Sequence, residues 1–281
     1  NAGIAGQMYV YQTYMEGQER KQSAWSKWSF GKDRLMDAVV VDDELITLRK
    51  QTLAADGGGT ILIIEATDLS GNQEGPNVQI GNVVYTWPFP IHLDHMDVIA
   101  NGIYDTVSGY TEWSFGSASQ YPTGYTDYEI DTVVQVDGTY HNVVPTDDGQ
   151  GIRTTANVNL ADAVLLVGRR VNSEITLTES FARDRERKPI LDGRTTLKKI
   201  VVSHKDSKQY EIIVTSKLAN AETRTSSFSS SALEFAGESV TWTQGNTEST
   251  TVTLKSDNPY PNTWTGYEFH GLLSHQIDGS N

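Results

Sequence analysis

The sequence predicts an all-β protein of sandwich, barrel or propeller form. Short runs rich in Val, Ile, Thr, Tyr and Trp recur about every ten residues, and turn-forming pairs such as Glu16-Gly17 and Asp137-Gly138 separate them. No segment carries an apolar stripe with the helical period of about 3.6 residues over three turns. This periodicity leaves strands as the main building elements.

The sequence of the first zone, residues 1–67, predicts four or five consecutive strands, near 7–15, 20–30, 35–41, 44–53 and 60–66. A meander of this size matches one propeller blade. One blade cannot bury both of its faces, and Trp25, Trp28 and the apolar run 38–41 need further cover. Because the chain starts at Asn1 without Met, we expect it to be part of a longer chain that supplies this cover.

The second zone, residues 68–160, contains chain breaks at Gly75-Pro76 and at residues 88–90. The third zone, residues 161–281, contains a predicted strand pair, 197–203 and 210–215, around the turn residues 205–207. A Ser/Thr-rich series of strands then extends to about residue 275. We therefore predict three β regions in the 281-residue chain.

The negative charge is concentrated in one stretch. Residues 51–152 carry fourteen carboxylates and no Lys or Arg. The other 22 of the 36 acidic residues balance the 22 basic ones, so this stretch holds the whole net charge of −14. Because a field of one sign repels a polyanion, the stretch argues against a conventional nucleic-acid grip. It leaves open a surface past which DNA slides, a cation site or an acidic outer face.

One acidic segment has a clear strand geometry. A strand over residues 127–134 places Asp127, Glu129 and Asp131 on one face, and Tyr128, Ile130, Thr132 and Val134 on the other. The second set is the natural buried side. The three carboxylates suit either a solvated edge or outer face, or the negative wall of a channel, and we name them as channel-lining candidates.

A basic run follows in the third zone. Residues 183–199 contain seven Lys or Arg and three acidic residues. In a protein whose neighbours are copies of itself, this run can contact the acidic stretch of the next copy. The subunit-interface candidates are Arg183, Arg185, Arg187 and Lys188. A DNA-binding role for the run ranks lower, because acidic residues interrupt it and no aromatic residues are interleaved with it.

Other chemistries have weaker support. The group His92, Asp94, His95 and Asp97 offers metal-ligand types, but strand positions three apart face opposite sides. Zero cysteines exclude thiolate ligands and disulfides. Paired carboxylates and six tryptophans would suit a carbohydrate-binding or glycoside-hydrolysing β-protein, which is the alternative function. No catalytic residue, metal or cofactor is predicted.

Several segments in a fixed order carry a family resemblance. They are residues 8–11, 19–31 with Trp25 and Trp28, 42–48, 168–174, 193–199 and 263–268. In this order they resemble the C-terminal portion of the nozzle protein (tail tubular protein B) family of short-tailed bacteriophages.

The resemblance implies a non-enzymatic structural subunit of the phage tail nozzle, which forms the conduit for DNA ejection into the host. It implies propeller-like blade strands followed by β-sandwich or barrel-like nozzle domains. It implies a ring of six copies below an adaptor ring (tail tubular protein A), with tail fibres and the host envelope at the tip as further contacts. Genomic DNA would pass through without specific binding. The protein would be assembled in the host cytoplasm and located in the tail of the virion.

Overall fold

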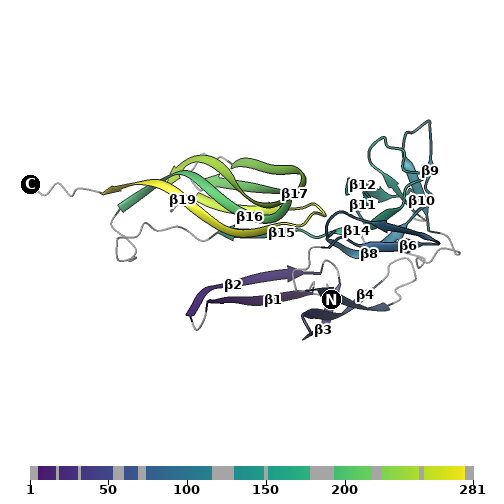
Figure 1. The fold of residues 1–281 in the computed structure, drawn as a ribbon, viewed down its shortest axis with the longest axis horizontal. Coiled ribbons are helices and arrows are strands. Elements are labelled where there is room, and N and C mark those ends of the chain that lie inside the picture. The colour runs from purple at the N-terminus through teal and green to yellow at the C-terminus, as the bar shows by residue number, and fades with distance from the viewer. Residues whose placement is uncertain are drawn as a thin grey trace, which may run out of the picture. The chain divides into compact units, whose positions relative to one another are not determined.

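A computed structural model describes residues 6–16, 19–30, 33–52, 60–68, 74–115, 130–148, 151–177, 193–216, 223–246 and 250–275. Every regular element in these ranges is a strand, which confirms the predicted all-β class (Figure 1). The strands form two curled, half-barrel sheets and three smaller sheets. Within the same ranges, no helix has the length and apolar character needed to cross a membrane.

The chain forms two compact units that interleave along the sequence. Unit 1 comprises Asn1–Glu74, His95–Gln135 and Thr139–Arg169. Unit 2 comprises Gly75–Asp94, Val136–Gly138 and Arg170–Asn281. The division into zones 1–67, 68–160 and 161–281 stays a prediction.

The five strands predicted in the first zone are all present. They are β1 (Gln7–Glu16), β2 (Glu19–Ser29), β3 (Arg34–Val41), β4 (Glu44–Thr52) and β5 (Thr60–Asp68). They form a β1-β2 hairpin and a separate β3-β4-β5 sheet, so the expected propeller blade is wrong for the described residues. At the turn before β3, Asp33 O accepts a hydrogen bond from Gly6 N at 2.8 Å. This bond ties the start of β3 to the residue before β1, while the β3 ladder runs along β4.

Unit 1 is built around a seven-stranded sheet in the order β8-β14-β11-β12-β13-β10-β9. The strands are β8 (Leu93–Ile99), β9 (Ile103–Tyr104), β10 (Thr111–Ser114), β11 (Thr132–Gln135), β12 (Tyr140–Pro145), β13 (Gly151–Thr154) and β14 (Leu165–Arg170). Its core includes Trp113, Val133 and Ile152, all almost completely buried. Ile61 and Ile63 of β5 pack against this core, so part of the first zone and the acidic stretch share it.

Unit 2 contains the hairpin β6 (Asn77–Ile80) and β7 (Val83–Thr86) and a five-stranded sheet. The sheet consists of β15 (Ser173–Leu177), β16 (Gly193–Ser216), β17 (Thr223–Asn246), β18 (Thr250–Ser256) and β19 (Thr263–His275). Strand β16 pairs with β17 along most of its length, with β19 in its first half and with β18 in its second half. Its core includes Ile200, Tyr210 and Leu254.

The predicted strand pair 197–203 and 210–215 is wrong, because both segments belong to the single 24-residue strand β16. The predicted turn at 205–207 is a bend within it. Asp206 adopts φ 45°, and the ladder to β17 shifts between Ser207 and Gln209. The turn-forming residues therefore redirect one strand instead of reversing the chain.

Candidate functional surfaces and buried polar clusters

Most of the predicted site residues lie outside the described part of the chain. This holds for Asp127 and Glu129 and for the whole basic group Arg183, Arg185, Arg187 and Lys188. Asp131 is described and half-buried. Its N–H donates to Gly168 O at 3.2 Å, its carbonyl accepts from Val143 N at 2.9 Å, and its Oδ1 accepts from Thr132 Oγ1 at 2.7 Å. The channel-lining and interface roles stay predictions.

The strand that follows Asp131 confirms part of the predicted alternation. Ile130, Thr132 and Val134 are buried, as predicted. Val133 on the opposite face is also fully buried, as part of the hydrophobic core of unit 1, and β11 lies between β14 and β12 in the sheet. Asp131 therefore precedes a central strand that is covered on both faces, and not an edge strand.

The candidate metal group falls on both sides of the division between the two compact units. The boundary between the two compact units falls between Asp94 and His95, so His92 and Asp94 are assigned to unit 2, and His95 and Asp97 to unit 1. His95 has a left-handed backbone, with φ 53°, and its Nε2 lies 3.3 Å from Asp33 Oδ2. The imidazole thus takes part in a different cluster, which the sequence did not suggest.

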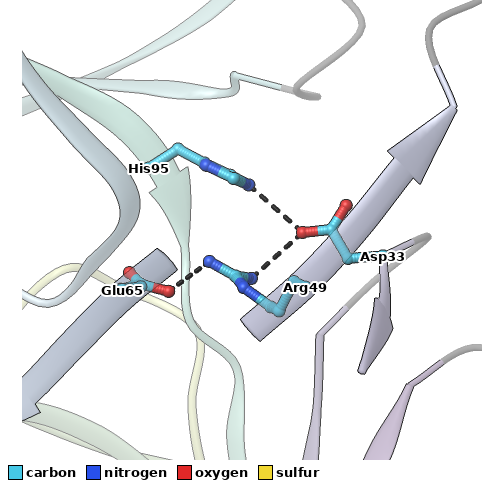
Figure 2. Close-up of polar contacts among 4 residues, drawn as sticks. All are labelled: Asp33, Arg49, Glu65 and His95. Carbon is cyan, nitrogen blue, oxygen red and sulfur yellow. Dashed lines mark hydrogen bonds and ion pairs between the residues drawn. The ribbon is translucent and has the colours of Figure 1, made fainter. Parts of the chain in front are cut away.

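This cluster centres on Arg49, as Figure 2 shows. The Arg49 side chain is completely buried; its Nη1 lies 3.1 Å from Asp33 Oδ2, and its Nη2 pairs with Glu65 Oε2. The guanidinium carbon also lies 5.3 Å from the centre of the Phe30 ring. A buried guanidinium needs compensating carboxylates, because removing it from water is costly. The Arg49 cluster thereby links β4, β5 and β8 within unit 1.

The Arg49 cluster could not be predicted from the sequence, because strand β4 buries polar side chains where strand alternation would place apolar ones. On β4, Thr47, Arg49 and Gln51 are buried on the same face as Leu45. The neighbouring β5 instead exposes Leu62 and Ile64. Alternation alone assigns polar residues to solvent, so only the distant partners reveal this polar interior.

Unit 2 holds its own enclosed cation, Lys208. The Nζ atom lies 4.3 Å from the ring centres of both Phe89 and Tyr260, and the two rings meet edge-on at 5.6 Å. Desolvation lowers the pKa of Lys208, and the charge of Asp137 opposes this shift. The next residue, Gly138, has φ 86°, and a Cβ there would overlap the Phe89 ring. We call this arrangement the Lys208 clamp. It joins the loops that carry Phe89, Asp137 and Tyr260 to strand β16 within unit 2.

A buried hydrogen-bond chain lies beside the bend of β16. His204 Nδ1 is 2.8 Å from Tyr210 Oη, which donates to Ser239 Oγ at 2.9 Å. Glu234 Oε2 lies 3.6 Å from His204 Nε2. Burial raises the pKa of Tyr210, the hydrogen bond to Ser239 lowers it, and the charge of Glu234 raises it further. His204 and Tyr210 are buried beside Phe228 and Trp264, whereas the Glu234 side chain is 40% exposed. The buried part of this chain therefore suits a packed polar core.

A family model for the bacteriophage nozzle protein matches residues 2–277 of the chain. A comparison with curated proteins found no match.

Proposed function

The chain belongs to the bacteriophage nozzle protein family, which implies a structural role in the phage tail and a location in the virion tail, and from this premise we propose that it forms part of the DNA ejection conduit. The observation that carries the proposal is the family match over nearly the whole chain. Copies of the chain form a ring, six in number as the resemblance implies. The two curled sheets are the candidate nozzle domains of each copy.

The charge distribution supports passage of DNA without adhesion. Duplex DNA carries about one negative charge per 1.7 Å of its axis, and each Lys or Arg on a wall offers a site for counterion release. Residues 51–152 lack both residue types. Salt screens charges beyond roughly 8 Å at physiological ionic strength, so this property matters only where residues line a narrow bore. We place Asp127, Glu129 and Asp131 on that wall.

Ring assembly uses the basic run 183–199 against the acidic stretch of the next copy. The adaptor ring (tail tubular protein A) lies on one side, and the tail fibres and the host envelope are further contacts. If close pairing at the interface outweighs repulsion across the bore, low ionic strength strengthens self-association. We expect this outcome, and sedimentation at graded salt concentrations measures it. Weaker self-association at low salt would mean that repulsion between acidic residues across the bore outweighs the pairing at the interface.

The wall assignment is tested by reversing charge in assembled particles. We expect the Asp127→Lys, Glu129→Lys, Asp131→Lys variant to enter virions normally and to release DNA more slowly, because three lysines per copy bind phosphates. The double variant that spares half-buried Asp131 separates this effect from misfolding. A matched control replaces the exposed acids Glu44, Glu174 and Asp257 by Lys outside the stretch. Normal DNA release from assembled triple-variant particles would show that residues 127–131 do not line the path of the DNA.

The alternative function, that of a carbohydrate-binding or glycoside-hydrolysing protein, requires a different arrangement of side chains. A hydrolase needs two carboxylates about 5–5.5 or 6.5–9.5 Å apart, one of them with a raised pKa. Release of reducing sugar from bacterial surface polysaccharide, abolished by one carboxylate-to-amide substitution, would replace the conduit proposal.

A further inference from the structure

Strand β17 has an open edge of unusual length. It pairs with β16 on one side, and the described residues form no ladder on its other side. Natural edge strands are commonly short or protected by Lys or Pro, because an open edge recruits other strands. The 24 residues of β17 include neither Lys nor Pro. This edge therefore lacks those two barriers to pairing with a further strand.

A second open edge lies on the opposite side of the same half-sheet. A ladder shift divides β17, and its second part, residues 234–246, pairs with the first half of β16. The 13-residue strand β19 pairs with the other side of that same half of β16, and the described residues give β19 no second ladder. Figure 1 shows β19, β16 and β17 running alongside one another. Residues 234–246 also number thirteen, so the two edges match in length.

The directions of the two edges match as well. Both β17 and β19 run antiparallel to β16, so they are parallel to each other. Rotation about an axis along the strands preserves strand direction. It therefore brings the β17 edge of one copy to the β19 edge of the next in a parallel arrangement. Because the two edges differ, the contact repeats head to tail and can close into a ring.

Exposed apolar side chains lie on the strands that carry these edges. Trp242 of β17 is 70% exposed, and it shares a face with Val240, which is 46% exposed. Lys199 Nζ lies 5.8 Å from the Trp242 ring centre. On β19, Leu272 is 64% exposed. An exposed tryptophan with a polar rim is typical of the centre of a protein interface.

We propose that β17 of one copy pairs in parallel with β19 of the next copy, which joins the half-sheets of unit 2 into a continuous sheet around the ring. The inference rests on the proposed function, which supplies the copies. A second copy is the partner because each chain carries both edges, equal in length and equal in direction. Each contact covers one open edge on each of the two copies and brings Trp242 toward β19 of its neighbour.

Engineered cysteines test the pairing cleanly, because the chain has no cysteine of its own. Val240→Cys is combined in turn with Glu268→Cys, His270→Cys and Leu272→Cys to cover the register. Within one chain these positions lie on either side of β16, about 10 Å apart, which is beyond disulfide reach. Oxidation of assembled protein should give covalent multimers for at least one pair. The control pair Val240→Cys and Lys205→Cys, with the second cysteine on the central strand, should give none.

An exposed-residue substitution supplies a second readout that does not depend on register. Trp242→Arg should fold normally and weaken self-association at least tenfold by sedimentation. Tyr9→Arg, at an aromatic residue of unit 1 that is 65% exposed, is the matched control and should have no such effect. Normal association of the Trp242 variant without linkage in any pair would overturn the strand pairing and leave the ring intact. Dimers from Val240→Cys alone, or links to another tail protein, would also overturn it. A wild-type chain that never self-associates would instead refute the proposed function.

Discussion

Arg49 and Lys208 are both cations enclosed by the fold, but the two units surround them differently. Arg49 in unit 1 is completely buried and pairs with the carboxylates of Asp33 and Glu65. Lys208 in unit 2 is half-buried and lies between two aromatic rings. A fully desolvated charge needs opposite charges, whereas a cation that keeps some water can be stabilised by ring faces.

The difference also concerns which parts of the chain each cation connects. The Arg49 cluster joins β4 and β5 to His95 of β8 by ion pairs of Arg49 and a hydrogen bond of His95 with Asp33 in unit 1. The Lys208 clamp joins loops of unit 2 by apolar packing around one charge. Removing one charged residue should therefore lower the free energy of unfolding far more in the Arg49 cluster than in the Lys208 clamp.

The largest effect is expected from Arg49→Met. The substitution leaves the buried carboxylate of Asp33 without its guanidinium, and breaking such a pair costs about 3–5 kcal/mol. We expect a loss of this size in the free energy of unfolding, measured by urea denaturation. The double variant Asp33→Asn, Arg49→Met should recover much of it, because the two fully buried charges are then removed and the remaining Glu65 side chain is 30% exposed. A loss below about 1 kcal/mol for Arg49→Met alone would contradict the assignment of the cluster as a structural ion pair.

A smaller loss is expected when the Lys208 clamp is distorted by Gly138→Ala. The added Cβ would overlap the Phe89 ring, and the alanine would have to keep the left-handed backbone of Gly138. We therefore expect a destabilisation of about 1–3 kcal/mol. Gly81 provides a matched control, because its φ is 61° and a Cβ there meets nothing within 4 Å. Gly81→Ala should cost only the backbone strain. Equal losses in thermal or urea unfolding would show that Phe89 does not restrict this site.

Sequence reasoning succeeded where the signal is local. The five strands of the first zone are defined by alternation and by short turns, so all were located within a few residues. The hairpin predicted around residues 205–207 was wrong, because the same turn-forming residues can produce either a hairpin or a bend within one strand. A blade was expected from consecutive strands, but strand order does not specify which neighbours pair.

The buried clusters could not be predicted for a different reason. Arg49 is recognisable as an interior residue only through Asp33, Glu65 and His95, and His95 lies 62 residues from Asp33. Likewise, Phe89 and Tyr260 are brought to Lys208 by the fold and not by sequence spacing. One signal was available: Gly138 follows Asp137 in a turn that needs a positive φ.

Tyr210→Phe is expected to have a modest, pH-dependent effect on the free energy of unfolding. This variant is also the background in which the Lys208 clamp is tested below. The pKa of Tyr210 is raised in the fold, so above about pH 10 the unfolded chain loses this proton first. The folded state then holds more protons, and stability falls as pH rises. Tyr210→Phe should remove this alkaline fall while costing about 1–3 kcal/mol at neutral pH, since it leaves buried polar groups without a partner. An unchanged alkaline slope in urea unfolding would contradict the prediction.

The smallest effect is expected from Lys208→Met, with a change within about 1 kcal/mol at neutral pH, because lost ring contacts are offset by the avoided desolvation of the ammonium. Its pH dependence has the opposite sign to that of Tyr210. The pKa of Lys208 is lowered in the fold, so as pH rises from this value toward 10.5 the folded state loses its proton first. The unfolded state then holds more protons, and stability rises with pH. In the Tyr210→Phe background, unfolding below about pH 10.5 should show this rise, and adding Lys208→Met should abolish it. A rise that persists without Lys208 would mean that another group titrates there, and that ring packing alone accounts for the clamp.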